Sequence, residues 1–237
     1  MGQAVPLPRL IMFDLDGTLV DTAIEIAHSV NQTLDEAGFD PLPPEWIREW
    51  IGKGTAWLFA TVLRRVTGQD EARASQLYDQ YYPRFLQVYH DLTGIHSRPY
   101  LGALEALEAL RAAGCQLAVV TNKDRDLSQR LLDSQGLAQA IDILVGGGDT
   151  PEGKPSPQPL QKALADAGLS AREALFVGDS SNDVQAARRA GVTVWAFNHG
   201  YNHGEPIAAA NPDRVLDSFP ELLQQLGVCP PLASQSI

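Results

Sequence analysis

The sequence predicts an α/β protein: a doubly wound parallel sheet (a Rossmann-like core) with an inserted all-helical cap domain. From residue 101 onward, short apolar runs of strand length alternate with helical segments, which is typical of βαβ units with parallel strands. Residues 22–93 instead show helical spacing of apolar residues without strand-like alternation. Polar residues directly follow several of the apolar runs, and sheets of this kind bind ligands beyond the carboxyl ends of their strands.

The first apolar run ends in two carboxylates, Asp14 and Asp16, and a Gly-Thr turn. Unpaired carboxylates are too costly to bury in a core, so they are expected at the open end of the sheet. Side chains two residues apart on a strand point the same way, so the two acids can converge on one site. Their repulsion would be relieved by a shared proton or by a hard cation such as Mg²⁺. A plain turn is the alternative, whereas an EF-hand loop is excluded because Gly17 stands at the wrong position.

Helices are expected next over residues 23–37, 44–51, 55–66 and 70–91. We therefore assign residues 1–20 and 94–237 to the α/β core and residues 21–93 to a helical cap. Because the cap follows the first strand directly, it is expected to lie over the carboxyl ends of the strands. Lys53, between two glycines of a cap loop, is either a substrate contact or an ordinary exposed lysine.

The second half of the chain predicts alternating elements. Helices are expected over residues 103–113, 126–135, 158–167, 183–190 and 220–226. Strands are expected over residues 115–120, 141–145, 174–177, 193–197 and, at an edge, 214–216. Residues 230–237 are expected to be a disordered tail.

Several of these strands end in polar residues that we expect on the same rim as Asp14. Thr121 and Asn122 are either a helix cap or hydroxyl and amide donors to a phosphate. Asp179 follows another strand, and with the first two acids it would complete a site for an oxygen-ligated divalent cation. Lys154 is a candidate cation for this rim, the alternative being a solvated surface lysine.

Other patterns have simpler interpretations. Ser181 or Asn182 is expected to cap the helix that follows Asp179. Residues 146–149 lack the Lys-Ser/Thr ending of a P-loop, so a flexible surface loop is favoured. His199 and His203 have glycines on both sides, which argues against a helix and hence against a zinc pair at helical spacing.

Composition narrows the class of partner. A net charge of −11 argues against binding to nucleic acid or an anionic membrane, although a metal and local cations can still attract an anion to one site. No apolar stretch approaches the roughly 20 residues of a membrane span, and residues 1–8 lack the features of a secretory signal. Cys115 and Cys229 imply no disulfide framework. We therefore expect a cytoplasmic protein, either a monomer or a homodimer.

These features together indicate phosphoryl transfer through an enzyme aspartate, because an aspartate carboxylate can act as the nucleophile toward phosphorus. Mg²⁺ would reduce its repulsion with the phosphate and fix its orientation. Asp16 can protonate the leaving alcohol and later deprotonate the attacking water. The expected partner is a small phosphorylated substrate.

The chain resembles the haloacid dehalogenase superfamily in four stretches, which occur in the order found in that superfamily. They are Asp14-Leu-Asp16-Gly-Thr-Leu-Val-Asp, Val120-Thr121-Asn122-Lys, Lys154-Pro-Ser-Pro and Gly178-Asp179-Ser-Ser-Asn-Asp183. The resemblance spans about residues 10–198, and the helical insertion resembles the cap of one branch.

The resemblance implies a role for each of these residues. Asp14 would be the nucleophile and Asp16 the acid and base, and an acid at that place argues against dehalogenation. Mg²⁺ would be bound by Asp14, Asp179 and the main-chain carbonyl of Asp16, with Asp183 supporting the site. The transferring phosphoryl group would be held by Thr121, Asn122 and Lys154.

Within the superfamily, the chain is similar to the phosphoglycolate phosphatases. The supporting stretches are residues 48–54, 147–150 and 200–206. Lys53 departs from the asparagine expected in the cap loop, and a cation there would suit a small carboxylate substrate. The alternatives are a phosphosugar mutase, a phosphatase for sugar phosphates or pyrophosphate, and a catalytically silent phosphate-binding module. Release of inorganic phosphate from a panel of esters separates these functions.

Overall fold

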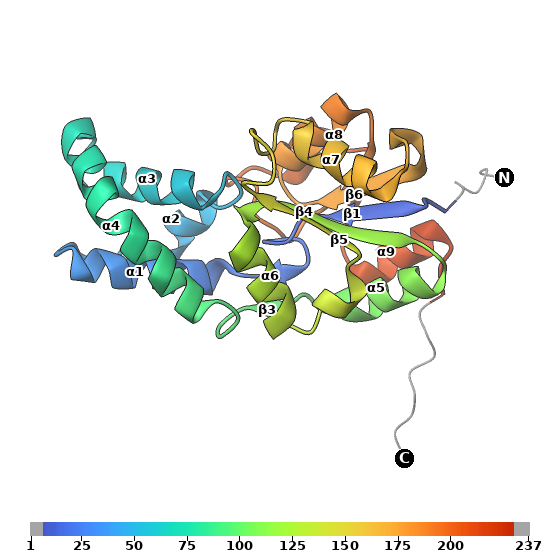
Figure 1. Ribbon diagram of the computed structural model, residues 1–237, viewed down its shortest axis with the longest axis horizontal. Coiled ribbons are helices and arrows are strands. Elements are labelled where there is room, and N and C mark those ends of the chain that lie inside the picture. The colour runs from blue at the N-terminus through green and yellow to red at the C-terminus, as the bar shows by residue number, and fades with distance from the viewer. Residues whose placement is uncertain (1–6, 230–237) are drawn as a thin grey trace, which may run out of the picture.

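The computed structural model describes residues 7–229 and has an α/β core joined to a helical body (Figure 1). The strands of the core run parallel in the order β5-β4-β1-β6-β7-β8. They are β1 (Leu10–Phe13), β4 (Gln116–Asp124), β5 (Ile143–Gly147), β6 (Ala174–Gly178), β7 (Thr193–Phe197) and β8 (Arg214–Leu216). This arrangement confirms the predicted fold class.

The first strand occupies the centre of the sheet, and the strand order reverses around it. Phe13 pairs with Val119 of β4 on one side and with Val177 of β6 on the other. Such a reversal opens a crevice at the carboxyl ends of the strands, where doubly wound sheets bind ligands. The register therefore places the residues that follow β1, β4 and β6 at one common crevice.

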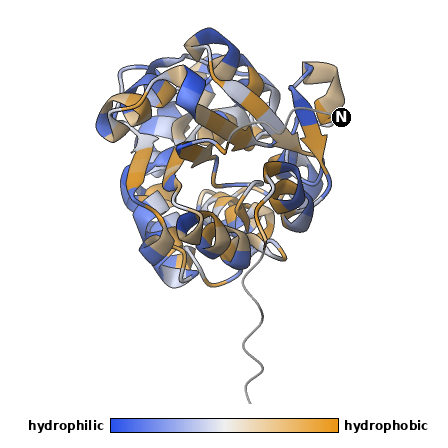
Figure 2. Cartoon of the chain, turned by 90° about the vertical axis from the view of Figure 1, so that its right-hand side faces the viewer, coloured by the Kyte–Doolittle hydropathy of each residue, from blue (hydrophilic) through white to orange (hydrophobic). Residues whose placement is uncertain are grey.

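Both faces of the sheet are covered by helices, which explains why β1 is apolar without alternation. Ile11 and Phe13 pack on one face, against α5 (Ala103–Ala112), α6 (Arg125–Ser134) and α9 (Phe219–Leu226). Leu10 and Met12 pack on the other face, against α7 (Gln158–Ala167) and α8 (Ser181–Ala190). Figure 2 shows the apolar residues concentrated along the strands and hydrophilic residues on the outer parts of the helices.

The helical body, which we call the cap, is built from the segment between β2 (Val20–Asp21) and β3 (Arg98–Pro99). Its helices are α1 (Ala23–Glu36), α2 (Pro44–Glu49), α3 (Thr55–Val66) and α4 (Glu71–Leu92). The cap has its own apolar core, in which Phe59 of α3 stacks on Phe85 of α4 with ring centroids 4.5 Å apart. Leu127 of α6 and Tyr201 of the core also join this cluster, so the cap is packed against the core.

The two connections between cap and core run side by side as a short antiparallel pair, β2 (Val20–Asp21) and β3 (Arg98–Pro99). The carboxylate of Glu25 strengthens this hinge: it is fully buried and accepts hydrogen bonds from the N–H groups of Gly94, His96 and Ser97. Neither β2 nor β3 was predicted from the sequence, because strands of two residues are too short to show alternation.

Two strands, β4 and β5, extend further than the sequence predicted. β4 continues through Asp124 instead of ending at Val120, with an irregularity in its register between these residues. Gly146 and Gly147 belong to β5 and not to a flexible loop. A Cβ on Gly146 would lie 2.6 Å from Cα of Arg125, so this glycine permits a close approach of two backbones.

The helix after Asp179 is capped by a different residue from the expected Ser181 or Asn182. Ser180 is the cap of α8, and Asp183 reciprocates by accepting a hydrogen bond from the Ser180 N–H group. The remaining short elements are the 3-10 helices η1 (Ala138–Ala140), η2 (Ala171–Glu173) and η3 (Ile207–Ala210). The expected tail at residues 230–237 lies outside the described residues.

Candidate active site

The carboxylate of Asp14 lies at the end of β1, almost completely buried beside a buried lysine. Its Oδ1 is 2.9 Å from Nζ of Lys154 and accepts a hydrogen bond from the N–H of Leu15. The same Nζ contacts Asp183 at 2.7 Å and the carbonyl of Val120 at 2.9 Å. Lys154 is therefore a fixed cation of the rim, and the interpretation as a solvated surface lysine is wrong.

Asp179 approaches this group from the end of β6. One of its oxygens accepts the hydroxyl of Thr18, and the other accepts the N–H of Tyr201 at 2.6 Å. Backbone passes close to this carboxylate from two sides. A Cβ added to Gly17 or Gly200 would lie 2.5 Å or 2.1 Å from Oδ2 of Asp179. Only glycine at these two positions leaves the carboxylate in place.

The oxygens of Asp14, Asp179 and Asp183 can all lie within 4.8 Å of one another. Burial raises the pKa of Asp14 from 3.8 to about 6, with Asp183 adding to the rise and Lys154 opposing it. Burial, followed by the charges of Asp183 and Asp14, raises the pKa of Asp179 well above its usual value. The group thus holds more negative charge than Lys154 offsets, and its oxygen donors suit a hard divalent cation.

Asp16 has a different environment from these three acids. Its carboxylate oxygens lie 3.1 and 3.4 Å from Nζ of Lys123, and the same Nζ donates a hydrogen bond to the hydroxyl of Tyr89 from cap helix α4. Neither partner was predicted from the sequence. Lys123 could have been found, because it stands two residues after Thr121 on β4 and so shares its direction. Tyr89 gave no signal, because only the folded cap brings it to the core.

Thr121 and Asn122 lie beside these acids but have different hydrogen-bond partners. Thr121 is buried next to Asp14, and its hydroxyl accepts the N–H of Lys123 at 3.3 Å. The side-chain amide of Asn122 donates to the carbonyls of Gly52 and Lys154 and accepts the N–H of Lys154. Asn122 therefore joins the Lys154 loop to the cap loop, and neither residue is the helix cap that was one alternative.

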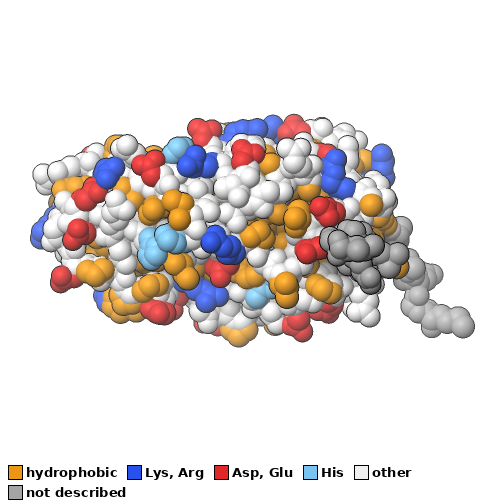
Figure 3. Space-filling view, turned by 90° about the horizontal axis from the view of Figure 1, so that it is seen from below, with side chains coloured by type: hydrophobic (Ala, Val, Ile, Leu, Met, Phe, Trp, Pro, Cys, Tyr) orange, Lys and Arg blue, Asp and Glu red, His pale blue; other side chains and the backbone are white. Residues whose placement is uncertain are grey.

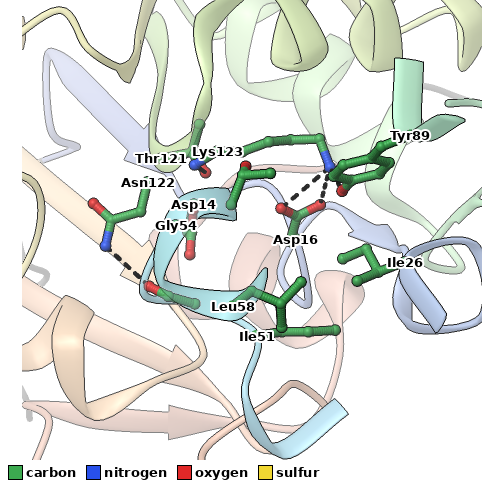
Figure 4. A pocket seen from close by; sticks show the side chains of 12 residues that line it. Asp14, Asp16, Ile26, Ile51, Gly54, Leu58, Tyr89, Thr121, Asn122 and Lys123 are labelled. Atoms are coloured by element: carbon green, nitrogen blue, oxygen red, sulfur yellow. Dashed lines mark hydrogen bonds and ion pairs between the residues drawn. The ribbon is translucent and has the colours of Figure 1, made fainter. Parts of the chain in front are cut away.

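A cavity of about 30 Å³ lies between these core residues and the cap (Figure 4). Asp14, Asp16 and Thr121 line its core side. Apolar cap residues close the opposite side, namely Ile26, Ile51 and Leu58. The candidate nucleophile and the candidate acid thus face a small chamber with polar groups at one end and apolar walls at the other.

Lys53 does not line this chamber. It is exposed on the loop between α2 and α3, and its Nζ lies 4.6 Å from the centre of the Trp57 ring. It lines an adjoining, larger cavity of about 400 Å³, together with Asn122 and Lys154. The structure therefore places Lys53 at a neighbouring opening and not beside Asp14 and Asp16.

We expect Gly200→Ala to disrupt the acidic group while leaving the fold intact. The added methyl group would overlap the Asp179 carboxylate, which must then leave its hydrogen bond with Tyr201. Phosphate release, the activity expected from the sequence, should fall by about 10- to 100-fold, the effect of disturbing a group that supports a predicted metal ligand. Gly168→Ala is a control for backbone strain away from the acids: a Cβ there meets nothing within 4 Å, but the φ of 67° is left-handed, so this variant should lose some stability and keep its activity. Equal activities of the two variants would contradict the close fit around Asp179.

On the face shown in Figure 3, acidic and basic side chains are interspersed with apolar ones. Among the helices of residues 7–229, none has the length and apolar character needed to cross a membrane.

Comparisons with known proteins agree with this architecture. Residues 11–197 match a family model described as haloacid dehalogenase-like hydrolase. The chain is 39% identical over 220 residues to a phosphoglycolate phosphatase of Pseudomonas syringae pv. tomato, covering 92% of this chain and 79% of that protein. It is 37% identical over 233 residues to a phosphoglycolate phosphatase of Yersinia pseudotuberculosis, covering 97% of each.

Solved structures show the same likeness. A crystal structure described as a predicted phosphoglycolate phosphatase from Haemophilus somnus 129PT superimposes with a TM-score of 0.86 at 36% identity, covering 91% of this chain and 96% of that one. The likeness therefore extends over both the core and the cap.

Proposed function

This chain belongs to the haloacid dehalogenase-like hydrolases, and we propose that it is a Mg²⁺-dependent phosphatase that hydrolyses 2-phosphoglycolate to glycolate and phosphate. The family and the relatives make it a phosphoric monoester hydrolase. The observation that carries the finer proposal is the position of Asp14, at the end of the central strand, held by Lys154 and facing a small chamber under the cap. The names of the relatives support phosphoglycolate as the substrate.

In the proposed reaction Asp14 attacks phosphorus and displaces the alcohol. The bond between phosphorus and the ester oxygen breaks, and Asp16 donates a proton to that oxygen as it leaves. Water then attacks the aspartyl phosphate while Asp16 takes a proton from it. This second step releases inorganic phosphate and restores the Asp14 carboxylate.

Neighbouring residues stabilise the charge that moves in these steps. Lys154, whose three donors are taken by Asp14, Asp183 and the carbonyl of Val120, contributes its positive charge beside the phosphoryl oxygens. Thr121 offers its hydroxyl to the same oxygens. Asn122 acts through its side-chain bridge, which fixes the backbone at Lys154. Asp14, Asp179 and the main-chain carbonyl of Asp16 are the proposed metal ligands, and Asp183 supports them. A bound Mg²⁺ would supply electrostatic stabilisation of the charge on the transferring group.

The cap is proposed to comprise residues 21–93, and the catalytic core residues 1–20 and 94–237. The core supplies the groups that act on phosphorus, whereas the cap supplies the apolar walls around the leaving group. The apolar cap walls lie close to Asp16, where the leaving group would sit.

The direct test is phosphate release by the purified protein over a panel of phosphate esters, with Mg²⁺ and with EDTA. We expect 2-phosphoglycolate to be the preferred substrate and EDTA to abolish release. Transfer of the phosphoryl group to a second sugar hydroxyl would indicate a mutase. Failure to release phosphate from any ester in Mg²⁺ would contradict the proposal and favour a silent binding module.

We also expect Mg²⁺ to stabilise the protein more at pH 7.5 than at pH 5. The folded-state pKa of Asp14 is raised from 3.8 to about 6, so between these values the folded state binds more protons than the unfolded state. The contribution of Asp14 to stability is therefore fully present below about pH 4 and is lost as pH rises through about 6. Metal binding requires the carboxylate form and compensates for that loss.

The measurement is the melting temperature with Mg²⁺ and with EDTA at the two pH values. Asp179→Asn is the matched variant, and its melting temperature should respond much less to Mg²⁺. Equal Mg²⁺ shifts at pH 5 and pH 7.5 in the unmodified protein would contradict a metal site built from these acids.

A further inference from the structure

Lys123 places a buried ammonium group in the chamber, and the proposed steps do not use it. Its side chain is 2% exposed, and it lines the same cavity as Asp14 and Asp16. Its Nζ donates to Asp16 and to the hydroxyl of Tyr89 (Figure 4). An ammonium group has three N–H donors, and within residues 7–229 these two groups are its hydrogen-bond partners. The two Asp16 oxygens lie 3.1 and 3.4 Å from Nζ and share one N–H in a bifurcated bond, which leaves one donor for a ligand.

The other buried lysine of the site is already fully engaged. Nζ of Lys154 contacts Asp14, Asp183 and the carbonyl of Val120, which together match its three donors. Lys123 is therefore the buried cation of the chamber with capacity for a further anion, among the residues that the structure describes. Removal from water makes such a cation attract an anion more strongly than an exposed lysine does.

The position of Lys123 relative to the reacting groups determines how far the bound anionic group can lie from the ester oxygen. In the proposed reaction the ester oxygen lies next to Asp16, and Nζ of Lys123 is 3.1 Å from that carboxylate. A carboxylate carbon two bonds from the ester oxygen, as in an ester of a 2-hydroxy acid, would lie close to the same Nζ. The hydroxyl of Tyr89 accepts a hydrogen bond from Lys123 and holds the ammonium group at the cap side.

We propose that Lys123 binds the carboxylate of the leaving group, held in position by Tyr89, and so selects phosphate monoesters of short 2-hydroxy acids. This inference rests on the proposed phosphatase function and names the residue that recognises its substrate. It replaces Lys53 in that role. The Lys53 ammonium is exposed, lies against Trp57 and lines the neighbouring cavity, where solvent weakens its attraction for an anion.

The test compares two esters that differ only in the recognised group. 2-Phosphoglycolate carries the carboxylate, and 2-hydroxyethyl phosphate replaces it with an uncharged hydroxymethyl group. The quantity measured is the ratio of kcat/KM for the first ester to that for the second. We expect Lys123→Met to lower this ratio by about 10- to 100-fold, mainly through KM for 2-phosphoglycolate, because a charge-assisted hydrogen bond is lost.

Further variants separate recognition from other roles of the lysine. Lys53→Met should change the ratio less than about twofold, and Lys123→Arg should restore part of it. Lys162→Met, on the surface of α7 and paired with Asp166, should leave both activities unchanged. Tyr89→Phe keeps the ring and removes the hydroxyl that accepts from Lys123, so it should lower the ratio by a smaller factor. If Lys123→Met folds poorly, Tyr89→Phe provides a second measurement of the same ratio.

Each outcome decides between the proposals. If Lys123→Met lowers kcat/KM equally for both esters, Lys123 only positions Asp16 and the inference is wrong. If the ratio falls in Lys53→Met but not in Lys123→Met, the carboxylate binds at the outer cavity and the inference is also wrong. If the unmodified protein releases phosphate from other esters but not from 2-phosphoglycolate, the proposed substrate itself fails.

Discussion

Asp14→Asn should abolish phosphate release while preserving the fold. The amide is a poor nucleophile toward phosphorus, so kcat should fall by about 10⁴-fold or more, as when other enzymes lose their nucleophile. The fold should survive because Asp14 is not a source of stability at neutral pH. Burial raises its pKa to about 6, which means that its charged form is disfavoured in the folded protein.

The measurement is phosphate release from 2-phosphoglycolate, together with circular dichroism and the melting temperature. Asp166→Asn is a matched control, because it removes a carboxylate from the exposed surface of α7. That control should keep full activity. Substantial turnover by Asp14→Asn would refute the nucleophile, and so would a phosphoryl group trapped on a residue other than Asp14 in the unmodified protein.

Lys154→Met should lower the stability of the protein as well as its activity. Burial alone would lower the pKa of Lys154, but Asp14 and Asp183 outweigh burial and raise it, so the ammonium stays charged. Its removal leaves two buried carboxylates without their cation. Breaking a buried ion pair in this manner costs about 3–5 kcal/mol, and the phosphoryl group also loses a stabilising charge.

Denaturant unfolding in EDTA, compared with Lys162→Met, would measure this cost. The surface variant should change the free energy of unfolding by less than about 1 kcal/mol, since exposed pairs contribute little. We expect Mg²⁺ to restore part of the stability of Lys154→Met by compensating the acids, but not its activity. A loss of stability no larger than that of the surface variant would show that Lys154 is not the counter-ion of these acids.

The sheet and the positions of the polar groups at its edge were predictable from the sequence for one reason. In a parallel sheet every strand ends at the same side, so polar residues that follow apolar runs must meet there. Asp14 and Asp179 lie 165 residues apart in the chain, yet each follows a neighbouring strand, and the structure brings them together. The apolar runs alone were sufficient to place them.

The side-chain pairing within the site was not predictable in the same way. Asp183 accepts three hydrogen bonds from Asp179 and Ser180 and one from Lys154, which depends on a helix cap one residue earlier than expected. Asn122 was predicted as a helix cap or an amide donor to a phosphate, but its amide donates to the carbonyls of Gly52 and Lys154. Such pairings depend on the exact residue at which a helix or turn begins, and hydrophobic periodicity does not resolve a boundary to one residue.

The contacts between cap and core are the least predictable part of the site. Lys123 and Tyr89 belong to elements with separate apolar patterns, and no local rule relates the two patterns. Their contact depends on how one packed body rests on another. Lys123 could be placed near the site from its position on β4, but its contact with Tyr89 became visible only when both bodies were present.

The antiparallel pair of β2 and β3 makes the cap a replaceable part. Because the chain leaves and re-enters the core along two adjacent strands, the ends of any transplanted segment need to meet a gap of only about 5 Å. A foreign insert of different size or helix number could be joined there without altering the spacing of Asp14, Lys154 and Asp179. Evolution, or protein engineering, can thus change which molecule enters the site while Asp14, Lys154 and Asp179 stay in place.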